Sequence, residues 1–523
     1  MFTVVFAWGC LFLVARGLSR YRFDTAFGPL WGMPDDVYIS AAFARTFAHG
    51  GGLRWYPGAP AVEGFSNPLW VLVLALLHVV PGFREDDLGL YVGILNGLMI
   101  LLIACVFVDA VTRATGPSAW SWPRAALALA LAWTTSIALC FWAGSGFETT
   151  AIALLALTAF REALAPAGQL RLPRIALLIA LAFWTRIDAI IPCSAAILTV
   201  ARRLRWSRSL LLPSVGLVAL TGSQFPLRRW YFGEWLPNTY YLKATGWPFA
   251  DRVTQGLLGS FVPVLLLLCV VVPCWRFMRS GLGSAALPVT SALITYGLSL
   301  GYSIHNGGDL AYFYGYDRFT AIGSIFLGFA VVSAAFELRM GPLRASGLAL
   351  LALLVTTGPT WILRPNSLAT LADLFDLRKP SLPTDQLMRG WADDGKRLRE
   401  VLQPNARIAT CGAGAVIYFS HRGGVDLLGK VEPIVAHQPV RITAPPDTRC
   451  WRRFPGAGHN KEDVRAVFEQ REPDASLLTP PESQRARYER VRVGNLEFFA
   501  LRESPLVRWS KLAVARDPEV HVR

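Results

Sequence analysis

Charged side chains recur at the ends of apolar segments in this sequence of 523 residues. The clearest case is the adjacent pair Asp35 and Asp36, which follows the first apolar segment and opens an amphipathic run. Charge at a membrane boundary is costly, so it tends to be kept for function. The pair alone has a second interpretation, in which it only starts a helix and Asp35 occupies the cap position.

Further acids, bases and amides lie in connectors that the charge pattern assigns to the same membrane face. They are Glu63, Glu148, Asp188 and Asp309; Arg45, Arg186, Arg228, Arg229, Lys243 and Arg318; and Asn67 and Asn238. Acids beside bases at a lipid–water boundary suit the transfer of a group from a lipid-borne phosphate. A carboxylate accepts the proton of an acceptor hydroxyl, while cations hold the phosphate. Each residue alone also has a structural explanation, such as a snorkelling Arg186.

The adjacent carboxylates have two further properties. They repel each other, so that one holds its proton to higher pH, or they share a divalent cation. Neighbouring side chains on a helix diverge by about 100°. We therefore expect Asp35 to be the base or acceptor-orienting group and Asp36 its electrostatic or metal-binding partner. We expect no required cofactor, and a divalent cation at this pair stays open.

The composition indicates a membrane protein. Hydrophobic residues make up 53% and charged residues 17%, whereas soluble proteins carry about 25% charged residues. The formal charge of +15 does not point to nucleic acid, because the arginines are spread between apolar segments as the positive-inside rule predicts. Residues 2–18 lack a basic leader and a cleavage site, so we interpret them as a retained span.

The apolar segments predict a polytopic α-helical fold with eleven transmembrane spans. The spans fall near 2–18, 88–112, 125–142, 149–165, 175–188, 189–201, 209–226, 257–275, 284–304, 318–336 and 345–362. The stretch 67–81 is too short to cross and is expected to be interfacial, and 186–190 should be a break. Alternate connectors are rich in arginine, which predicts a cytoplasmic N-terminus and an outer first loop, 19–87.

The polar region 363–523 predicts an extracytoplasmic α/β domain, which could bind carbohydrate. We expect a helix over 384–402, a strand over 407–412, a helix over 413–419, buried strands at 424–428 and 475–478, and a hairpin over 488–502. The outer location makes Cys411 and Cys450 candidates for a disulfide, with two reduced core cysteines as the alternative. Gly412 and Gly414 after a strand are a weak nucleotide-binding signal, since the third glycine is missing.

Several motifs occur in an order that resembles a known family. They are Asp35-Asp-Val-Tyr-Ile-Ser40, Val62-Glu-Gly-Phe-Ser-Asn-Pro-Leu-Trp70, Ser145-Gly-Phe-Glu-Thr149, Thr185-Arg-Ile-Asp188, Tyr231-Phe-Gly to Leu236-Pro-Asn-Thr-Tyr240, Gly307-Gly-Asp309 and Asp426-Leu-Leu-Gly-Lys-Val-Glu-Pro-Ile-Val-Ala-His437. Together they resemble the AftB-type arabinofuranosyltransferases among the GT-C membrane glycosyltransferases.

The resemblance implies a polyprenyl-phosphate sugar donor, an inverting mechanism and an extracytoplasmic site in a multi-pass protein of the bacterial inner membrane. By this resemblance Asp35 is the acid of the first outer loop, Glu148 the acid of the second, and Arg186 a phosphate-contacting base. Ile187 and Phe147 depart from the usual Thr-Arg-Pro-Asp and Gly-Leu-Glu-Thr patterns.

Together the residues and the resemblance predict a GT-C-like transferase, residues 1–362, that moves a pentose such as arabinofuranose to an envelope glycan hydroxyl during cell-wall biogenesis. Its catalytic residues are Asp35, Asp36 and Glu148, and its donor-phosphate ligands are Arg186, Arg228, Arg229, Lys243 and Arg318. The remaining acids, bases and amides named above bind substrate. The alternatives are another donor sugar or a protein or lipid acceptor, a transporter, and a non-catalytic envelope scaffold.

Overall fold

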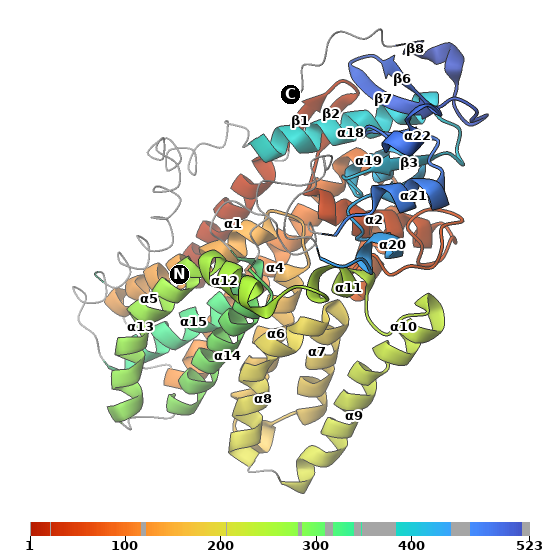
Figure 1. Ribbon diagram of the computed structural model, residues 1–523. Helices are drawn as coiled ribbons and strands as arrows, with labels where there is room; N and C mark the ends of the chain where they lie inside the picture. Colours follow the sequence, from red (N-terminus) through yellow and green to blue (C-terminus); the bar gives the residue numbers. More distant parts are fainter. Residues whose placement is uncertain are drawn as a thin grey trace. The chain divides into compact units, whose positions relative to one another are not determined.

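The computed structural model describes residues 2–20, 22–116, 122–204, 207–280, 285–308, 317–338, 347, 383–440 and 461–514. The chain forms two compact units, each assembled from three stretches of sequence (Figure 1). Unit 1 comprises Met1–Arg20, Gly89–Gln224 and Pro248–Pro380, and unit 2 comprises Tyr21–Leu88, Phe225–Trp247 and Ser381–Arg523. The predicted domain boundary at residue 362 lies outside the described residues.

Unit 1 is helical throughout the part that is described. Its α-helices are α1 (Phe2–Arg20), α4 (Leu88–Thr115), α5 (Trp122–Ala143), α6 (Thr149–Ala163), α7 (Leu172–Thr185), α8 (Ile190–Leu204), α9 (Leu211–Gly222), α12 (Phe249–Gly259), α13 (Phe261–Ser280), α14 (Ala286–His305) and α15 (Arg318–Glu337). Helix α15 is apolar around its circumference and buried along nearly its whole length, as expected for a helix at the centre of a bundle. Helices α5, α6, α13 and α14 surround it.

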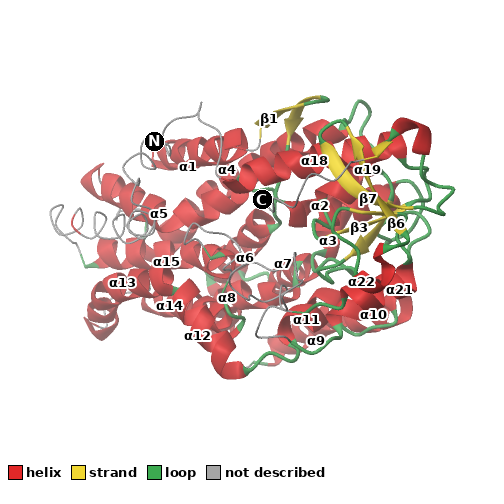
Figure 2. Cartoon of the chain, turned by 45° about the horizontal axis from the view of Figure 1, so that its top comes forward, coloured by secondary structure: helices red, strands yellow, loops and turns green. Residues whose placement is uncertain are grey.

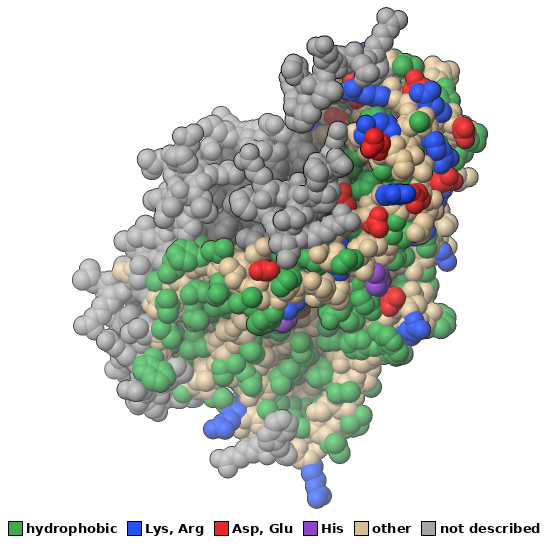
Figure 3. Space-filling model, viewed as in Figure 1, with side chains coloured by type: hydrophobic (Ala, Val, Ile, Leu, Met, Phe, Trp, Pro, Cys, Tyr) green, Lys and Arg blue, Asp and Glu red, His purple; other side chains and the backbone are tan. Residues whose placement is uncertain are grey.

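Within the described residues, three helical segments are long and apolar enough to cross a membrane. They are Glu85–Thr115, Arg208–Phe232 and Arg318–Glu337, and the bent pair α12–α13 with its 63° break makes a fourth if it counts as one span. Pro68–His78 and Leu172–Thr185 are apolar but shorter. Figure 3 shows hydrophobic side chains gathered over α8, α9 and α14. The count of eleven spans stays a prediction.

The predicted break at 186–190 is confirmed. Helix α7 ends at Thr185, and Arg186 is extended with φ −159° and ψ 143°. A short 3₁₀ turn over Ile187–Ala189 follows, and α8 begins at Ile190. The extended residue rotates its side chain out of the helical series, which frees the guanidinium to meet groups from other helices.

Unit 2 contains two sheets and several helices. The helices are α2 (Asp35–Ala48), α3 (Pro68–His78), α10 (Gln224–Phe232), α11 (Asn238–Ala244), α18 (Pro383–Val401), α19 (Ala415–Ser420), α20 (Pro433–Ala436), α21 (Val464–Arg471) and α22 (Glu482–Arg485). The strands are β1 (Arg22–Thr25), β2 (Gly28–Trp31), β3 (Arg407–Thr410), β4 (Gly423–Asp426), β5 (Ala475–Ser476), β6 (Tyr488–Val493), β7 (Leu496–Leu501) and β8 (Ala513–Val514). Short 3₁₀ turns lie at Glu85–Asp87, Ala167–Gln169, Arg208–Leu210 and Trp509–Lys511, the second and third of them in unit 1.

Strands β1 and β2 form an antiparallel hairpin, and the other six form a mixed sheet in the order β4-β3-β5-β7-β6-β8 (Figure 2). Strand β3 is parallel to β4 and β5, whereas β5, β6, β7 and β8 pair antiparallel. In the register of β3 and β4, Thr410 lies opposite Asp426. The carboxyl ends of these two parallel strands therefore meet at one edge, and the loops that follow them lie together.

The local elements expected for the C-terminal region are confirmed within about two residues, apart from the buried strands, which are shorter. The helix spans Pro383–Val401, the glycine turn lies between β3 and α19, and the hairpin is β6–β7. Cys411 is disulfide-bonded, and Cys450, its predicted partner, lies outside the described residues. Of the free thiols in apolar segments, Cys10, Cys140, Cys193 and Cys274 are buried, whereas Cys269 is half-buried and Cys105 is exposed.

Candidate active site

The sequence predicted that Asp35 caps its own helix. In the structure it instead binds the start of another helix, α19. The cap residue of α2 is Pro34, whose side chain accepts no hydrogen bond, and Asp35 is the first helical residue. The Asp35 carboxylate accepts the backbone N–H of Ala415 at 2.7 Å and that of Gly414 at 3.1 Å and 3.2 Å. These N–H groups open α19 and have no partner within that helix. The cap prediction fails because the carboxylate is turned toward them.

Close packing makes this contact specific. A methyl group added at Gly414 would come within 1.8 Å of the carbonyl oxygen of Asp35. Only a residue without a side chain lets the two backbones approach in this way. Asp35 is 7% exposed, and burial raises its pKa to about 6, with Lys430 and the two N–H groups acting in the opposite direction. A carboxyl with a pKa of about 6 is largely ionised at neutral pH, as a general base would have to be.

Asp36 forms an ion pair with Lys430, whose ammonium group donates to its carboxylate. The Asp36 side chain is 28% exposed and that of Lys430 11%. Burial lowers the pKa of Lys430, but the nearby Asp36 and Asp35 outweigh it and hold the pKa above its ordinary value. The two carboxylates expected to act together thus have different partners, one being neutral backbone and the other a cation.

Glu63 and Arg228, also in unit 2, form a buried pair. The Nε atom of Arg228 donates to both oxygens of Glu63, at 2.8 Å and 3.0 Å. Burial raises the pKa of Glu63 to about 7, although Arg228 lowers it. Asn238, whose backbone N–H bonds the carbonyl of Glu63 at 2.9 Å, donates its side-chain amide to the carbonyls of Gly429 and Lys430 at 2.9 Å and 3.1 Å. These residues therefore fasten the loop that carries Lys430.

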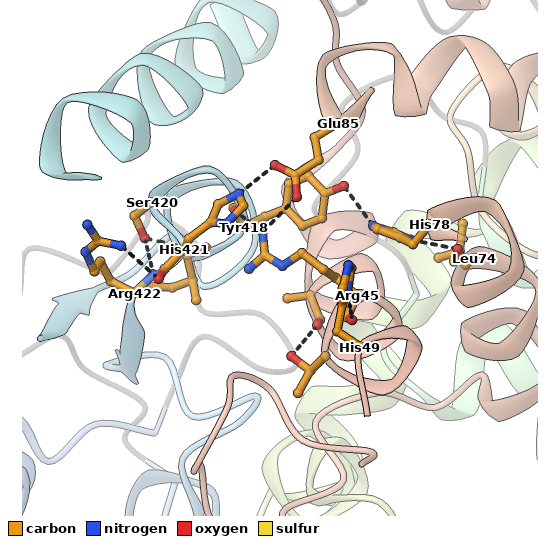
Figure 4. Close-up of polar contacts among 12 residues, drawn as sticks. Arg45, His49, Leu74, His78, Glu85, Tyr418, Ser420, His421 and Arg422 are labelled. Carbon is orange, nitrogen blue, oxygen red and sulfur yellow. Dashed lines mark hydrogen bonds and ion pairs between the residues drawn. The ribbon is translucent and has the colours of Figure 1, made fainter. Parts of the chain in front are cut away.

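Arg45 belongs to a network that joins α2 to α19 (Figure 4). Its guanidinium lies 3.3 Å from a carboxylate oxygen of Glu85 and donates to the carbonyl of Tyr418. The other Glu85 oxygen lies 2.6 Å from Nε2 of His421, and His78 bonds the Tyr418 hydroxyl at 2.9 Å. This arrangement supports a structural role for Arg45 beside the predicted substrate contact.

The other predicted site residues of unit 2, Asn67, Arg229 and Lys243, lie on different helices or at their ends. Asn67 accepts a hydrogen bond from the Ser40 hydroxyl at 3.0 Å, which holds α2 against the start of α3. Arg229 is exposed and donates to the carbonyl of Gly233. Lys243 lies half-buried in the last turn of α11. The three stay candidates for substrate or phosphate contacts.

Unit 1 holds its own charged cluster, centred on Arg186. The guanidinium bonds both oxygens of Asp188, at 2.9 Å and 2.6 Å, and one oxygen of Glu148 at 2.9 Å. The side chains of Glu148 and Arg186 are only 2% and 12% exposed. One arginine therefore holds two carboxylates that the sequence separates by 40 residues, counted from 148 to 188.

A pocket adjoins this cluster. Its empty volume is about 360 Å³, part of it open to solvent. The polar residues that line it are Glu148, Thr149, Arg186, Asp188, Ser299, Tyr302 and Arg318. The guanidinium of Arg318 lies 4.8 Å from the ring centre of Phe147 and 5.7 Å from that of Phe319. The two arginines of the lining are matched by the carboxylates of Glu148 and Asp188, so its charged part is formally neutral, and the rest of the wall is mostly apolar.

The structure thus brings Glu148, Arg186, Asp188 and Arg318 together in unit 1, and Asp35, Asp36, Glu63, Arg228 and Asn238 around one loop region in unit 2. Asp309 lies outside the described residues. Among the residues that the structure describes, no three or more His, Cys, Asp or Glu side chains are placed to hold a metal ion. A divalent cation held by Asp35 and Asp36 would have to displace the Lys430 ammonium from Asp36, and the two carboxylates alone supply fewer oxygens than such a cation needs, so this donor set does not fit one.

Sequence reasoning missed Lys430, Gly414 and Tyr302. Lys430 stands in the motif that begins at Asp426, directly after a buried strand. A lysine that follows a glycine at the carboxyl end of a strand is a usable signal, because such edges gather functional side chains. In the sequence Gly414 carried only a weak signal for nucleotide binding, whereas its backbone N–H donates a hydrogen bond to the Asp35 carboxylate.

No protein-family profile matches the sequence, and no curated protein matches it. Solved structures are similar in fold. ArnT from Cupriavidus metallidurans in the apo state has a TM-score of 0.53 and 17% identity, covering 82% of this chain and 86% of ArnT. The same enzyme bound to undecaprenyl phosphate has a TM-score of 0.55 and 15% identity, covering 96% of this chain and 98% of ArnT. The Archaeoglobus fulgidus oligosaccharyltransferase in complex with Zn and sulfate is more distant, with a TM-score of 0.48, 12% identity, and 98% and 73% covered.

Proposed function

We propose that this protein, with the fold of ArnT, is a GT-C membrane glycosyltransferase that moves a sugar from a polyprenyl-phosphate donor to a hydroxyl of an envelope acceptor. The observation that carries the proposal is the likeness to ArnT bound to undecaprenyl phosphate, which extends over 96% of this chain and 98% of that one. The motif order in the sequence supports the same class.

The residues supply the chemistry that such a transfer needs. Asp35, as the general base, takes the proton of the acceptor hydroxyl, and the oxygen attacks the anomeric carbon of the sugar. The bond from that carbon to the phosphate oxygen breaks, and the polyprenyl phosphate leaves with the electron pair. The configuration at the anomeric carbon is inverted. A carboxylate offers about four acceptor positions, so the bonds from Gly414 and Ala415 leave Asp35 able to accept a proton.

The unit 1 pocket is our candidate for the donor phosphate. Arg186 and Arg318 supply positive charge, and the adjacent apolar wall suits the first carbons of the polyprenyl chain. Arg186 already bonds Glu148 and Asp188. A phosphate must therefore share this guanidinium with the two carboxylates, or bind through Arg318.

The finer parts of the proposal are a pentose donor such as arabinofuranose, an envelope glycan as acceptor, and a site on the extracytoplasmic side of the inner membrane. The motif resemblance supports the sugar, and the arginine-rich connectors support the orientation. Other sugars and protein or lipid acceptors belong to the same reaction class, and the mass of the accumulating donor distinguishes the sugars.

The test is mass spectrometry of lipid-linked sugars in a deletion strain, with complementation by the wild type or by Asp35→Asn. We expect one polyprenyl-phosphate sugar to accumulate, to fall on wild-type complementation and to stay high with Asp35→Asn. The accumulating mass identifies the sugar. Complementation by Asp35→Asn would instead exclude Asp35 as the base, and an unchanged lipid-linked sugar pool would contradict a transferase.

A further inference from the structure

The loop between β4 and α20 is built around a buried carboxylate. Asp426, the last residue of β4, is fully buried and accepts the N–H of Leu428 at 2.9 Å and that of Val431 at 2.8 Å. Gly429 between them takes φ +84°, which a residue with a side chain rarely adopts. The backbone on both sides of Lys430 is therefore fixed by one side chain.

A second contact holds the same loop from α11. The side-chain amide of Asn238 bonds the carbonyls of Gly429 and Lys430. The loop is thus bound at its N–H groups by Asp426 and at its carbonyls by Asn238. A lysine side chain that leaves such a backbone has little freedom beyond its own rotamers.

The sheet explains why Lys430 reaches the acidic pair. Strands β3 and β4 are parallel neighbours, so the loop after β3 and the loop after β4 lie at the same edge. The first loop gives its N–H groups to Asp35, and the second gives Lys430 to Asp36. Two adjacent residues of α2 are therefore met by two adjacent loops of the C-terminal region.

This arrangement does not leave the pair the ligands that a divalent cation needs. Mg²⁺ and Ca²⁺ require about six or more oxygen ligands in open geometry. Here Asp35 accepts backbone N–H groups and Asp36 accepts an ammonium. A cation bound by both carboxylates would have to displace Lys430, which is 9% exposed and anchored by its loop.

We propose that Lys430 is the fixed cation of this acidic pair and takes the place of a divalent metal ion, with Asp426 and Asn238 as its positioning residues. The inference rests on the proposed function for its catalytic meaning. Its structural content, that the pair is closed to metal by Lys430, is independent of which sugar is transferred. It also makes the C-terminal region a part of the candidate site.

The chain offers a matched control. Lys396 pairs with Asp86 at 2.7 Å, with side-chain exposures of 14% and 27%, close to the 11% and 28% of Lys430 and Asp36. Lys396→Met removes a similar ion pair from the same unit without touching Asp35 or Asp36. It therefore reports the effect of losing a half-buried lysine as such.

The first measurement is Mn²⁺ binding to the full chain in lipid nanodiscs, followed by electron paramagnetic resonance. We expect no Asp36-dependent Mn²⁺ site in the wild type, in Lys396→Met or in Lys430→Arg. Lys430→Met should gain one site, and the double variant Lys430→Met with Asp36→Asn should lose it. A wild-type Mn²⁺ site that Asp36→Asn abolishes would overturn the proposal, as would a Lys430→Met protein that folds and gains no site.

The second measurement is turnover of the reconstituted protein in EDTA. We expect wild-type turnover to persist, Lys430→Met to lose about 10–100-fold, as when a group that orients a functional residue is removed, and Lys430→Arg to recover part of it. Ethylammonium or Mn²⁺ should restore activity to Lys430→Met. Dependence of the wild type on added Mn²⁺ would refute the inference, whereas no transfer under any condition would refute the proposed function and leave the binding result to decide.

Discussion

Replacing Asp35 by Asn tests its chemical role against its structural one, because the two roles predict different pH behaviour. The Asp35 carboxylate binds two N–H groups of α19 and is buried. Asn keeps one oxygen, which can still accept from Ala415, but it places an NH₂ group where the second oxygen faces Gly414 at 3.1 Å. Loss of a hydrogen bond to a charged acceptor costs about 1.5–3 kcal/mol.

A second effect opposes this loss. Raising the pKa of Asp35 from 3.8 to about 6 means that its ionisation costs the folded state about 3 kcal/mol at neutral pH. Asn does not ionise, so this cost disappears. The two effects are of similar size, and we expect Asp35→Asn to unfold near the wild-type temperature at pH 7.5.

The balance changes with pH. Because the folded pKa lies above the unfolded one, the stability that comes from protonating Asp35 is fully present below pH 3.8 and is lost as the pH rises through 6. Between pH 7.5 and pH 5 the wild type should therefore gain about 1.4 kcal/mol relative to Asp35→Asn. Thermal unfolding of both proteins across this range, followed by tryptophan fluorescence, measures the difference.

Turnover and donor binding should be measured on the same preparation as thermal unfolding. If Asp35 is the base, Asp35→Asn should bind donor and lose roughly 10²–10⁴-fold in turnover, and wild-type turnover should rise with pH through about 6. Parallel unfolding curves at all pH values would refute the raised pKa. A stable, donor-binding and fully active Asp35→Asn would exclude this residue as the base.

Three other predictions concern the remaining features. Gly414→Ala should lower the unfolding temperature and turnover together, because its methyl group collides with the Asp35 backbone; Gly390→Ala, which meets no atom within 4 Å, is the control. Arg186→Ala should cost about 3–5 kcal/mol of stability, since two acids lose their partner. Arg186→Lys should fold but bind undecaprenyl phosphate only partly, because a point charge replaces the two-pronged guanidinium. Unchanged phosphate binding in Arg186→Lys would remove this residue from the donor site. A periplasmic-type reporter should be active after residue 365 and inactive within 203–208, and the reverse pattern would contradict the orientation.

The sequence predicted local elements better than partners. The break at Arg186 and the strand β3 follow from patterns of a few residues, which sterics and hydrophobic alternation decide locally. Local sequence patterns could not predict which groups contact the Asp35 carboxylate. Its hydrogen-bond partner Gly414 is 379 positions away, and Glu63 is 165 positions from Arg228.

Charge type was therefore predictable and charge pairing was not. The sequence predicted Arg186 and Arg228 as phosphate-binding bases, and in the structure both pair with carboxylates, Arg186 with Glu148 and Arg228 with Glu63. Whether a cation faces a substrate or a neighbouring acid depends on the packing of distant segments. The cap assignment of Asp35 failed for the same reason, since Pro34 supplies the backbone geometry locally and α19 supplies the competing N–H groups from afar.

The assembly of unit 2 from three separate stretches has a consequence for biosynthesis. Residues 21–88 are made first, but the segment that pairs with Asp35 and Asp36 begins after residue 381. At about 5–20 residues per second, synthesis of the intervening 292 residues, 89 to 380, takes on the order of 15–60 s. During this interval the early loop has emerged without the groups that neutralise its acids. The order of translation thus leaves unit 2 incomplete until residues 381–523 have been made, and the acids of the early loop stay without these partners until then.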